Sequence, residues 1–113
     1  MSRGHQRERD VCHWLRDRDW FAMRAPASLG VADVVALREG DRPRLIEVKS
    51  TAGGPYERFG PADRADLLAA AAMAGAEAWL AWWPPRGKLR WIEASEWPVP
   101  SQTLATPSGQ AAL

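Results

Sequence analysis

The sequence is poor in cysteine and has no long hydrophobic segment. Its one cysteine, Cys12, excludes an intrachain disulfide and argues against a cysteine-based metal site. No run of about 18 apolar residues occurs, so no part of the chain is predicted to span a membrane. The polar start M-S-R-G-H-Q-R-E-R-D is unlike a secretory signal. We therefore expect an intracellular protein, in the cytoplasm or nucleoid of a cell or in the cytoplasm of a virus-infected host.

Charge of one sign is also lacking, because the formal net charge is only +1. A polyanionic partner would therefore have to be bound by local positive charge. Among the 15 basic residues only Lys49 and Lys88 are lysines. A chain that otherwise uses arginine places Lys49 in the segment E-V-K. This choice indicates a position that needs a compact ammonium, since a guanidinium differs in shape and stays protonated.

The length of 113 residues, with 46% hydrophobic and 26% charged residues, predicts one domain with a modest core. We place one folded domain over residues 1–97. Residues 98–113 are rich in Pro, Ser, Thr, Gln, Ala and Gly, and are predicted to form a flexible C-terminal tail. The apolar and turn patterns predict the order α-β-β-β-α-β-β, with helices over 6–19 and 62–74 and strands over 20–24, within 28–49, and over 77–83 and 89–94.

The segment from Ser28 to Lys49 reads as a β-hairpin, with two apolar runs around the turn E-G-D-R-P. Alternation along the strands places Asp33 near Glu47 or Lys49 on one sheet face. Buried charges cost several kcal/mol unless they are paired or bind a metal. A cluster of charges among Val, Ile and Leu is therefore expected at a functional site.

Glu8 lies on the apolar stripe of the first predicted helix, three or four residues before Val11 and Cys12. It is expected to point toward the sheet. The alternative is an acidic residue that only favours the helix N-terminus. Arg24 ends the first strand, and the small loop A-P-A-S-L-G with Ser28 suits contact with phosphates, although Arg24 would equally suit a surface ion pair. The Gly-rich loop after Lys49 is either a substrate-contacting flap or a plain connection.

Asp33 and Glu47 supply the hard oxygen ligands that Mg²⁺ prefers. The backbone carbonyl of Val48 would complete the shell, and Glu8 would bind through water or hold a second metal. Lys49 is placed to orient an attacking water or to stabilise charge on a phosphodiester. We expect Mg²⁺ as cofactor, with Mn²⁺ able to substitute.

The D-(X)13-E-V-K spacing resembles the PD-(D/E)XK nuclease superfamily. Further segments narrow the resemblance: G-H-Q-R-E-R-D, M-R before a small loop, S-L-G-V-A-D-V-V-A, I-E-V-K-S and W-I-E-A-S. Together, over residues 3–97, they are similar to the archaeal-type Holliday junction resolvases. The resemblance implies a restriction-endonuclease-like α/β fold, with a central mixed sheet flanked by helices.

The same resemblance implies a metal-dependent active site formed by Glu8, Asp33, Glu47 and Lys49. It also implies a homodimer that binds branched DNA and cuts two opposing strands of a four-way junction. Positions assigned to DNA binding are Arg9, Arg24 and Ser28 by the resemblance, together with Arg7 and Arg58.

Two features depart from the expected pattern. Ala32 stands where the motif has proline, and many arginines have acidic neighbours in the sequence, so DNA affinity is expected to be lower or more salt-sensitive than is typical of the family. Two other functions stay open. One is a related nuclease acting on flaps, mismatches or damaged duplex, since a fold does not determine a substrate. The other is a catalytically silent DNA-binding module.

Overall fold

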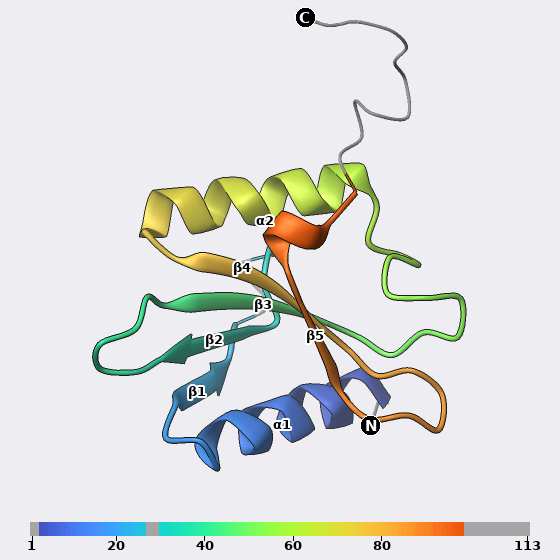
Figure 1. Cartoon of the computed structure of the whole chain (residues 1–113), viewed down its shortest axis with the longest axis horizontal. Helices are drawn as coiled ribbons and strands as arrows, with labels where there is room; N and C mark the ends of the chain where they lie inside the picture. The colour runs from blue at the N-terminus through green and yellow to red at the C-terminus, as the bar shows by residue number, and fades with distance from the viewer. Residues whose placement is uncertain (1–2, 27–29, 99–113) are drawn as a thin grey trace, which may run out of the picture.

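The structure, a computed structural model, describes residues 3–26 and 30–98. It has three layers, with a five-stranded sheet between two helices (Figure 1). The order of elements agrees with the predicted α-β-β-β-α-β-β and the restriction-endonuclease-like α/β class. The elements are α1 (Arg3–Arg16), β1 (Phe21–Arg24), β2 (Val34–Leu37), β3 (Arg44–Lys49), α2 (Pro61–Ala74), β4 (Glu77–Trp82), β5 (Arg90–Glu93) and the short 3₁₀ helix η2 (Ala94–Glu96).

The sheet is mixed, and its strands follow the chain order from β1 to β5. β1, β2 and β3 form an antiparallel meander, and β5 pairs antiparallel with β4. β3 and β4 are parallel, so the chain must cross from one end of the sheet to the other between them, and α2 makes this crossing. The ends of β3 and β4 that follow Lys49 and Trp82 therefore lie side by side.

Each face of the sheet carries its own core, because successive side chains of a strand point to opposite faces. On the α1 side, Val11 and Leu15 of the helix pack against Val34 and Ile46 of the hairpin. On the α2 side, the core contains Phe59, Leu67, Ala71, Ala76, Ala78, Leu80, Ile92 and Trp97. Burial on both faces agrees with the apolar character of β4.

The observed ends of the two helices agree with the sequence-based prediction for α2 but not for α1. Gly60 caps α2, where its N–H donates to Asp63 at 3.1 Å, and Gly75 ends the helix at φ 64°. The predicted range of 62–74 is therefore correct to one residue. The predicted range of 6–19 for α1 is wrong by three residues at each end. The chain turns after Arg16 because Asp19 adopts φ 69°, without a glycine to signal it.

The β2–β3 hairpin has a register that places acidic residues together. Val34 lies opposite Ile46, so one residue further along Asp33 lies across from Glu47. The turn passes through Gly40 at φ 85°, a conformation that side chains other than glycine adopt at a cost. The predicted hairpin is thus confirmed.

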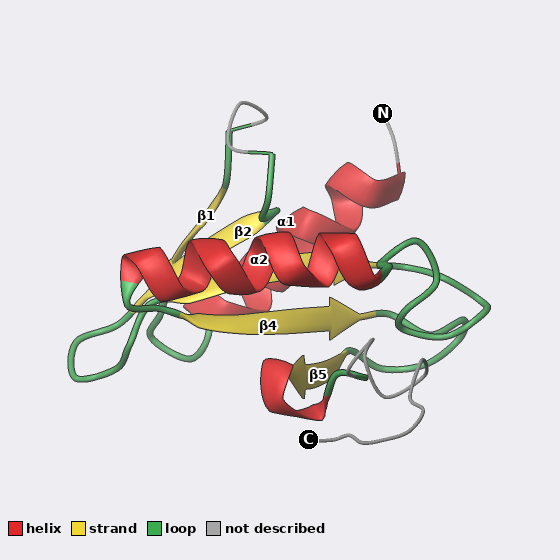
Figure 2. Ribbon diagram, turned by 90° about the horizontal axis from the view of Figure 1, so that it is seen from above, coloured by secondary structure: helices red, strands yellow, loops and turns green. Residues whose placement is uncertain are grey.

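On the α2 side, no helix of the described residues covers the part of the sheet formed by β1 and β2. Seen from above, α2 runs along β4, and β1 and β2 lie to one side of it (Figure 2). On this uncovered face Phe21, Met23 and Leu37 are 63%, 42% and 42% exposed. Cross-strand pairing of Phe21 with Leu37 makes them one apolar surface, which we call the β1–β2 face.

In the part of the chain that the structure describes, no helix is long and apolar enough to cross a membrane. Ser28 and almost all of the predicted tail over 98–113 lie outside the described residues.

Candidate active site

The end of the β2–β3 hairpin gathers two carboxylates and an ammonium. One oxygen of Asp33 (Oδ2) accepts a hydrogen bond from the N–H of Val48 at 2.8 Å. Lys49 Nζ lies 3.2 Å from Glu47 Oε2, and both side chains are less than one fifth exposed. Glu47 and Lys49 share a face because they are two positions apart on β3. The hairpin register therefore builds a compact acidic site with one cation.

Burial and mutual repulsion disfavour ionisation of the two carboxyls in this site. Burial raises the pKa of Glu47 to about 7, the nearby Asp33 carboxylate adds to the rise, and Lys49 opposes it. The pKa of Asp33 is also raised, again mainly by burial and against the hydrogen bond from Val48. A cation bound between the two carboxyls would favour their ionised forms and would reduce the repulsion between them.

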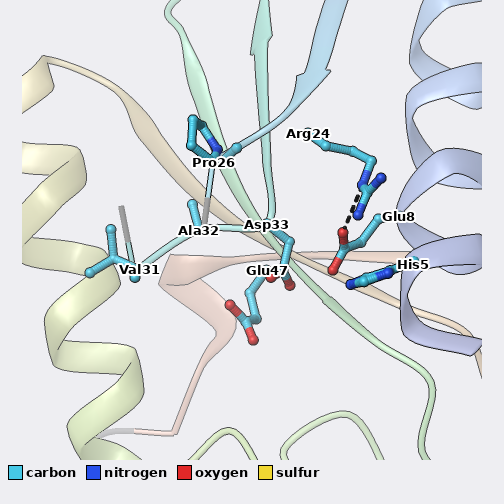
Figure 3. A pocket seen from close by; sticks show the side chains of 10 residues that line it. His5, Glu8, Arg24, Pro26, Val31, Ala32, Asp33 and Glu47 are labelled. Carbon is cyan, nitrogen blue, oxygen red and sulfur yellow. Dashed lines mark hydrogen bonds and ion pairs between the residues drawn. The ribbon is translucent and has the colours of Figure 1, made fainter. Parts of the chain in front are cut away.

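Helix α1 brings Glu8 to the same place. Its carboxylate (Oε1) accepts a hydrogen bond from Arg24 Nε at 3.0 Å, which joins α1 to the end of β1. Glu8, Arg24, Asp33 and Glu47 line a cavity of about 360 Å³ together with His5 (Figure 3). Glu8 adds to the raised pKa of Asp33 across this cavity. The structure therefore brings together the four residues predicted as catalytic, with Glu8 from α1 and Asp33, Glu47 and Lys49 from the hairpin.

Two acidic residues near this site were not anticipated. Asp63 and Asp66, from the first two turns of α2, line a smaller cavity of about 120 Å³ with Glu47, Lys49 and Arg58. The charge of Asp63 contributes to the raised pKa of Glu47. The sequence does place Asp63 at a helix start, where its carboxylate accepts the hydrogen bond from the N–H of the capping residue Gly60. Its position beside Glu47 depends on how α2 crosses the sheet, which no local pattern reveals.

The predicted DNA-binding residues lie at different places around the site. Arg24 borders the acidic cavity, and Arg58, exposed and at φ 62°, lines the smaller one. Arg7 lies over the ring of Trp83, with 4.5 Å from its guanidinium carbon to the ring centre, and pairs with Asp10 at 3.4 Å. Arg9 is half-buried on α1, and Ser28 lies outside the described residues.

The donor set fits a hard divalent ion that keeps several waters. Within residues 3–26 and 30–98, no group of three or more His, Cys, Asp or Glu side chains could by itself hold a metal ion. The available ligands are the carboxylates of Asp33 and Glu47 and the nearby backbone of Val48. Mg²⁺ is commonly held by one or two carboxylates, with water and substrate phosphate oxygens completing the octahedron. Glu8 already accepts a hydrogen bond from Arg24 through Oε1.

A mixed five-stranded sheet with a helix on each face, and a carboxylate pair with a lysine at the end of its central hairpin, defines a nuclease of the restriction-endonuclease-like class. Comparison with known proteins narrows this class. The chain belongs to the archaeal Holliday junction resolvase (Hjc) family, whose model matches residues 1–99.

A solved structure supports this assignment. The chain is 28% identical to Hjc from Archaeoglobus fulgidus, described as a Holliday junction resolvase from an archaeal hyperthermophile and determined at 1.6 Å resolution. The match has a TM-score of 0.71 and covers 83% of this chain and 75% of that one. No functionally curated protein matches the sequence significantly. The predicted family and fold class are therefore confirmed.

Proposed function

We propose that the chain is a metal-dependent endodeoxyribonuclease that resolves four-way DNA junctions by paired symmetric cleavage as a homodimer. Membership of the resolvase family supports the junction as substrate. The observation that carries the proposal is the meeting of Asp33, Glu47 and Lys49 at one end of the hairpin, beside the Glu8–Arg24 pair. Mg²⁺ is the proposed cofactor, and Mn²⁺ is expected to replace it.

Each residue has a role that follows from its surroundings. Asp33, Glu47 and the Val48 carbonyl would hold the metal, which when bound polarises the phosphodiester and lowers the pKa of a bound water. Lys49, held at 3.2 Å by Glu47, stabilises the negative charge that builds up on the oxygens of the attacked phosphate.

The Glu8–Arg24 pair sits at the edge of the same cavity. Arg24 contacts a phosphate beside the one that is cut, and Glu8 fixes the direction of its guanidinium. Arg7, Arg9, Arg58 and Ser28 are proposed to hold the DNA backbone around the site.

A second copy is needed for cleavage of two strands, because one domain carries one such site. The β1–β2 face is the surface we assign to the dimer. It is apolar and adjoins the side of α2 that carries Asp66, since Asp66 shares a cavity with Gly30 and Val31 in the segment that leads into β2. Ala70, one turn further, continues this side with a small residue that permits close approach.

Cleavage of matched substrates tests the proposal. The protein is incubated with Mg²⁺ and equal amounts of a four-way junction, a flap and a linear duplex of the same sequences. We expect paired nicks at symmetric positions in the junction, abolished by EDTA and by Asp33→Asn. Equal cutting of the flap or the duplex would favour the related nuclease on other substrates. Binding without cleavage, unchanged by Asp33→Asn, would leave the silent binding module.

A further inference from the structure

A second and larger cavity lies beside the proposed active site. It has a volume of about 610 Å³ and lies between the start of α1, the residues after Lys49 and the β4–β5 turn. Among the residues that the structure describes, its lining contains two arginines and no acidic side chain: Gln6, Arg7, Ser50, Thr51, Ala52, Trp83, Pro84, Pro85 and Arg86. The first cavity, by contrast, contains three carboxylates for one arginine. The two cavities therefore differ in the sign of their charge.

The larger cavity is joined directly to the strand that carries the site. Ser50 follows Lys49 in the chain, and the N–H of Trp83 donates to the carbonyl of Lys49 at 2.8 Å. Helix α1 borders both cavities, with Glu8 in the acidic one and Arg7 in the larger one. The lining of the cationic cavity therefore begins one residue after Lys49 in the chain.

The two arginines are prepared for an anion in different ways. The guanidinium of Arg7 is supported by the ring of Trp83, which limits the directions it can take. Its partner Asp10 lies 3.4 Å away, and both side chains are about one third exposed, so this ion pair is weak and can be exchanged for a phosphate. Arg86 is exposed on the turn closed by the bond from Gly87 N–H to the Pro84 carbonyl.

We propose that this cavity binds a phosphodiester of the cleaved DNA strand, close to the phosphodiester that is cut. Arg7 and Arg86 are its cations. The inference rests on the proposed function for its substrate. Its chemistry is recognition of the DNA backbone, since phosphate oxygens accept from guanidinium groups and from hydroxyls such as that of Ser50. Contacts of this kind position the strand and carry no information about base sequence.

The test compares two substitutions in one turn. Arg86→Asn and Lys88→Asn remove the same charge two positions apart, but only Arg86 lines the cavity. Asparagine also tolerates the φ of 57° at residue 86. Affinity for a four-way junction is measured without divalent ions over a range of salt concentrations, for two unrelated arm sequences. Circular dichroism and the melting temperature show whether each variant is folded.

A phosphate contact predicts a defined result for Arg86→Asn. Binding weakens several-fold for both sequences, and the slope of log affinity against log salt falls by about one. Lys88→Asn leaves the slope nearly unchanged. Arg86→Lys keeps the slope of the unaltered protein because a lysine still presents a point charge. Equal slopes for Arg86→Asn and Lys88→Asn would overturn the inference.

Failure of the inference can be told apart from failure of the proposed function. If the unaltered protein cuts junctions but the Arg86→Asn slope equals that of Lys88→Asn, the cavity proposal alone is wrong. If the slope falls as expected but no DNA is cut with Mg²⁺, the cavity binds backbone and the nuclease proposal is wrong.

Discussion

At the scale of single residues, the site depends on one ammonium among several carboxylates. Lys49 is held by Glu47, and the same hairpin end carries Asp33. A guanidinium at position 49 would keep the charge but would be larger, planar and aimed in a fixed fork. The sequence already suggested this constraint, since the chain otherwise prefers arginine.

Lys49→Arg is therefore expected to lower junction cleavage by about a hundredfold, because donors that stabilise a transition state act only in the right position. Single-turnover cleavage with Mg²⁺ measures the effect. Lys88→Arg, an exposed change of the same kind, is the control and should cut at the rate of the unaltered protein. Full activity of Lys49→Arg would show that position 49 does not require a compact ammonium.

The raised pKa of Glu47 predicts how stability depends on pH in the metal-free protein. Its pKa is about 7 in the folded chain and near 4.5 when exposed, so the folded state binds the proton more tightly. The contribution of this proton to the free energy of unfolding is therefore present at low pH and is lost as the pH rises from about 4.5 to 7. The raised pKa of Asp33 acts in the same direction.

Between pH 5 and pH 8 the free energy of unfolding of the metal-free protein is expected to fall by about 2 kcal/mol. Urea unfolding at a series of pH values in EDTA measures it. Glu47→Gln should flatten most of this dependence. Mg²⁺ should restore stability at pH 8, because it binds the folded state. A protein that grows more stable from pH 5 to pH 8 without metal would contradict the raised pKa.

At the scale of elements, only one side of α2 packs against the sheet. Leu67 is fully buried against the α2-side core, whereas its neighbour Leu68 is 44% exposed. Leu67→Ala is expected to cost about 3 kcal/mol and Leu68→Ala less than about 0.5 kcal/mol, since only the first leaves a cavity. Denaturant unfolding of the two variants provides the measurement. Similar losses in both would mean that α2 is seated differently.

The elements also show what could be predicted from the sequence. The hairpin was predictable because alternating apolar residues and a Gly-containing turn are local signals, and its register then placed Asp33 near Glu47. The α2 boundaries were predictable from Pro61 and Gly75. The end of α1 was not, because Asp19 adopts its left-handed conformation without a glycine.

Contacts across the fold were harder to foresee. Asp63 lies beside Glu47 only because α2 crosses between two parallel strands. The larger cavity likewise joins α1, the loop after β3 and the β4–β5 turn, three segments that are far apart in the chain. The resemblance to the resolvases supplied the role of Glu8, for which the helix pattern alone left two explanations.

At the scale of the whole molecule, the β1–β2 face predicts self-association. Leu37 on this face and Leu68 on the far side of α2 are similarly exposed, at 42% and 44%. Leu37→Glu is expected to give a monomer that still nicks DNA but has lost paired cleavage, because a charge in an apolar interface is costly. Leu68→Glu should remain a dimer. Sedimentation velocity and nick pairing on a junction distinguish the two, and a dimeric Leu37→Glu would place the interface elsewhere.

The order of the proposed site along the chain has one further consequence. Glu8, Arg24, Asp33, Glu47 and Lys49 all precede α2, β4 and β5. During synthesis the ribosome therefore releases every one of these groups before the strand that completes the centre of the sheet. A nascent chain of that length has its charges but not the Leu80 and Ile92 core behind them. We expect paired DNA cutting to begin only after α2, β4 and β5 have left the ribosome, the sheet has its core on both faces, and two finished copies have met.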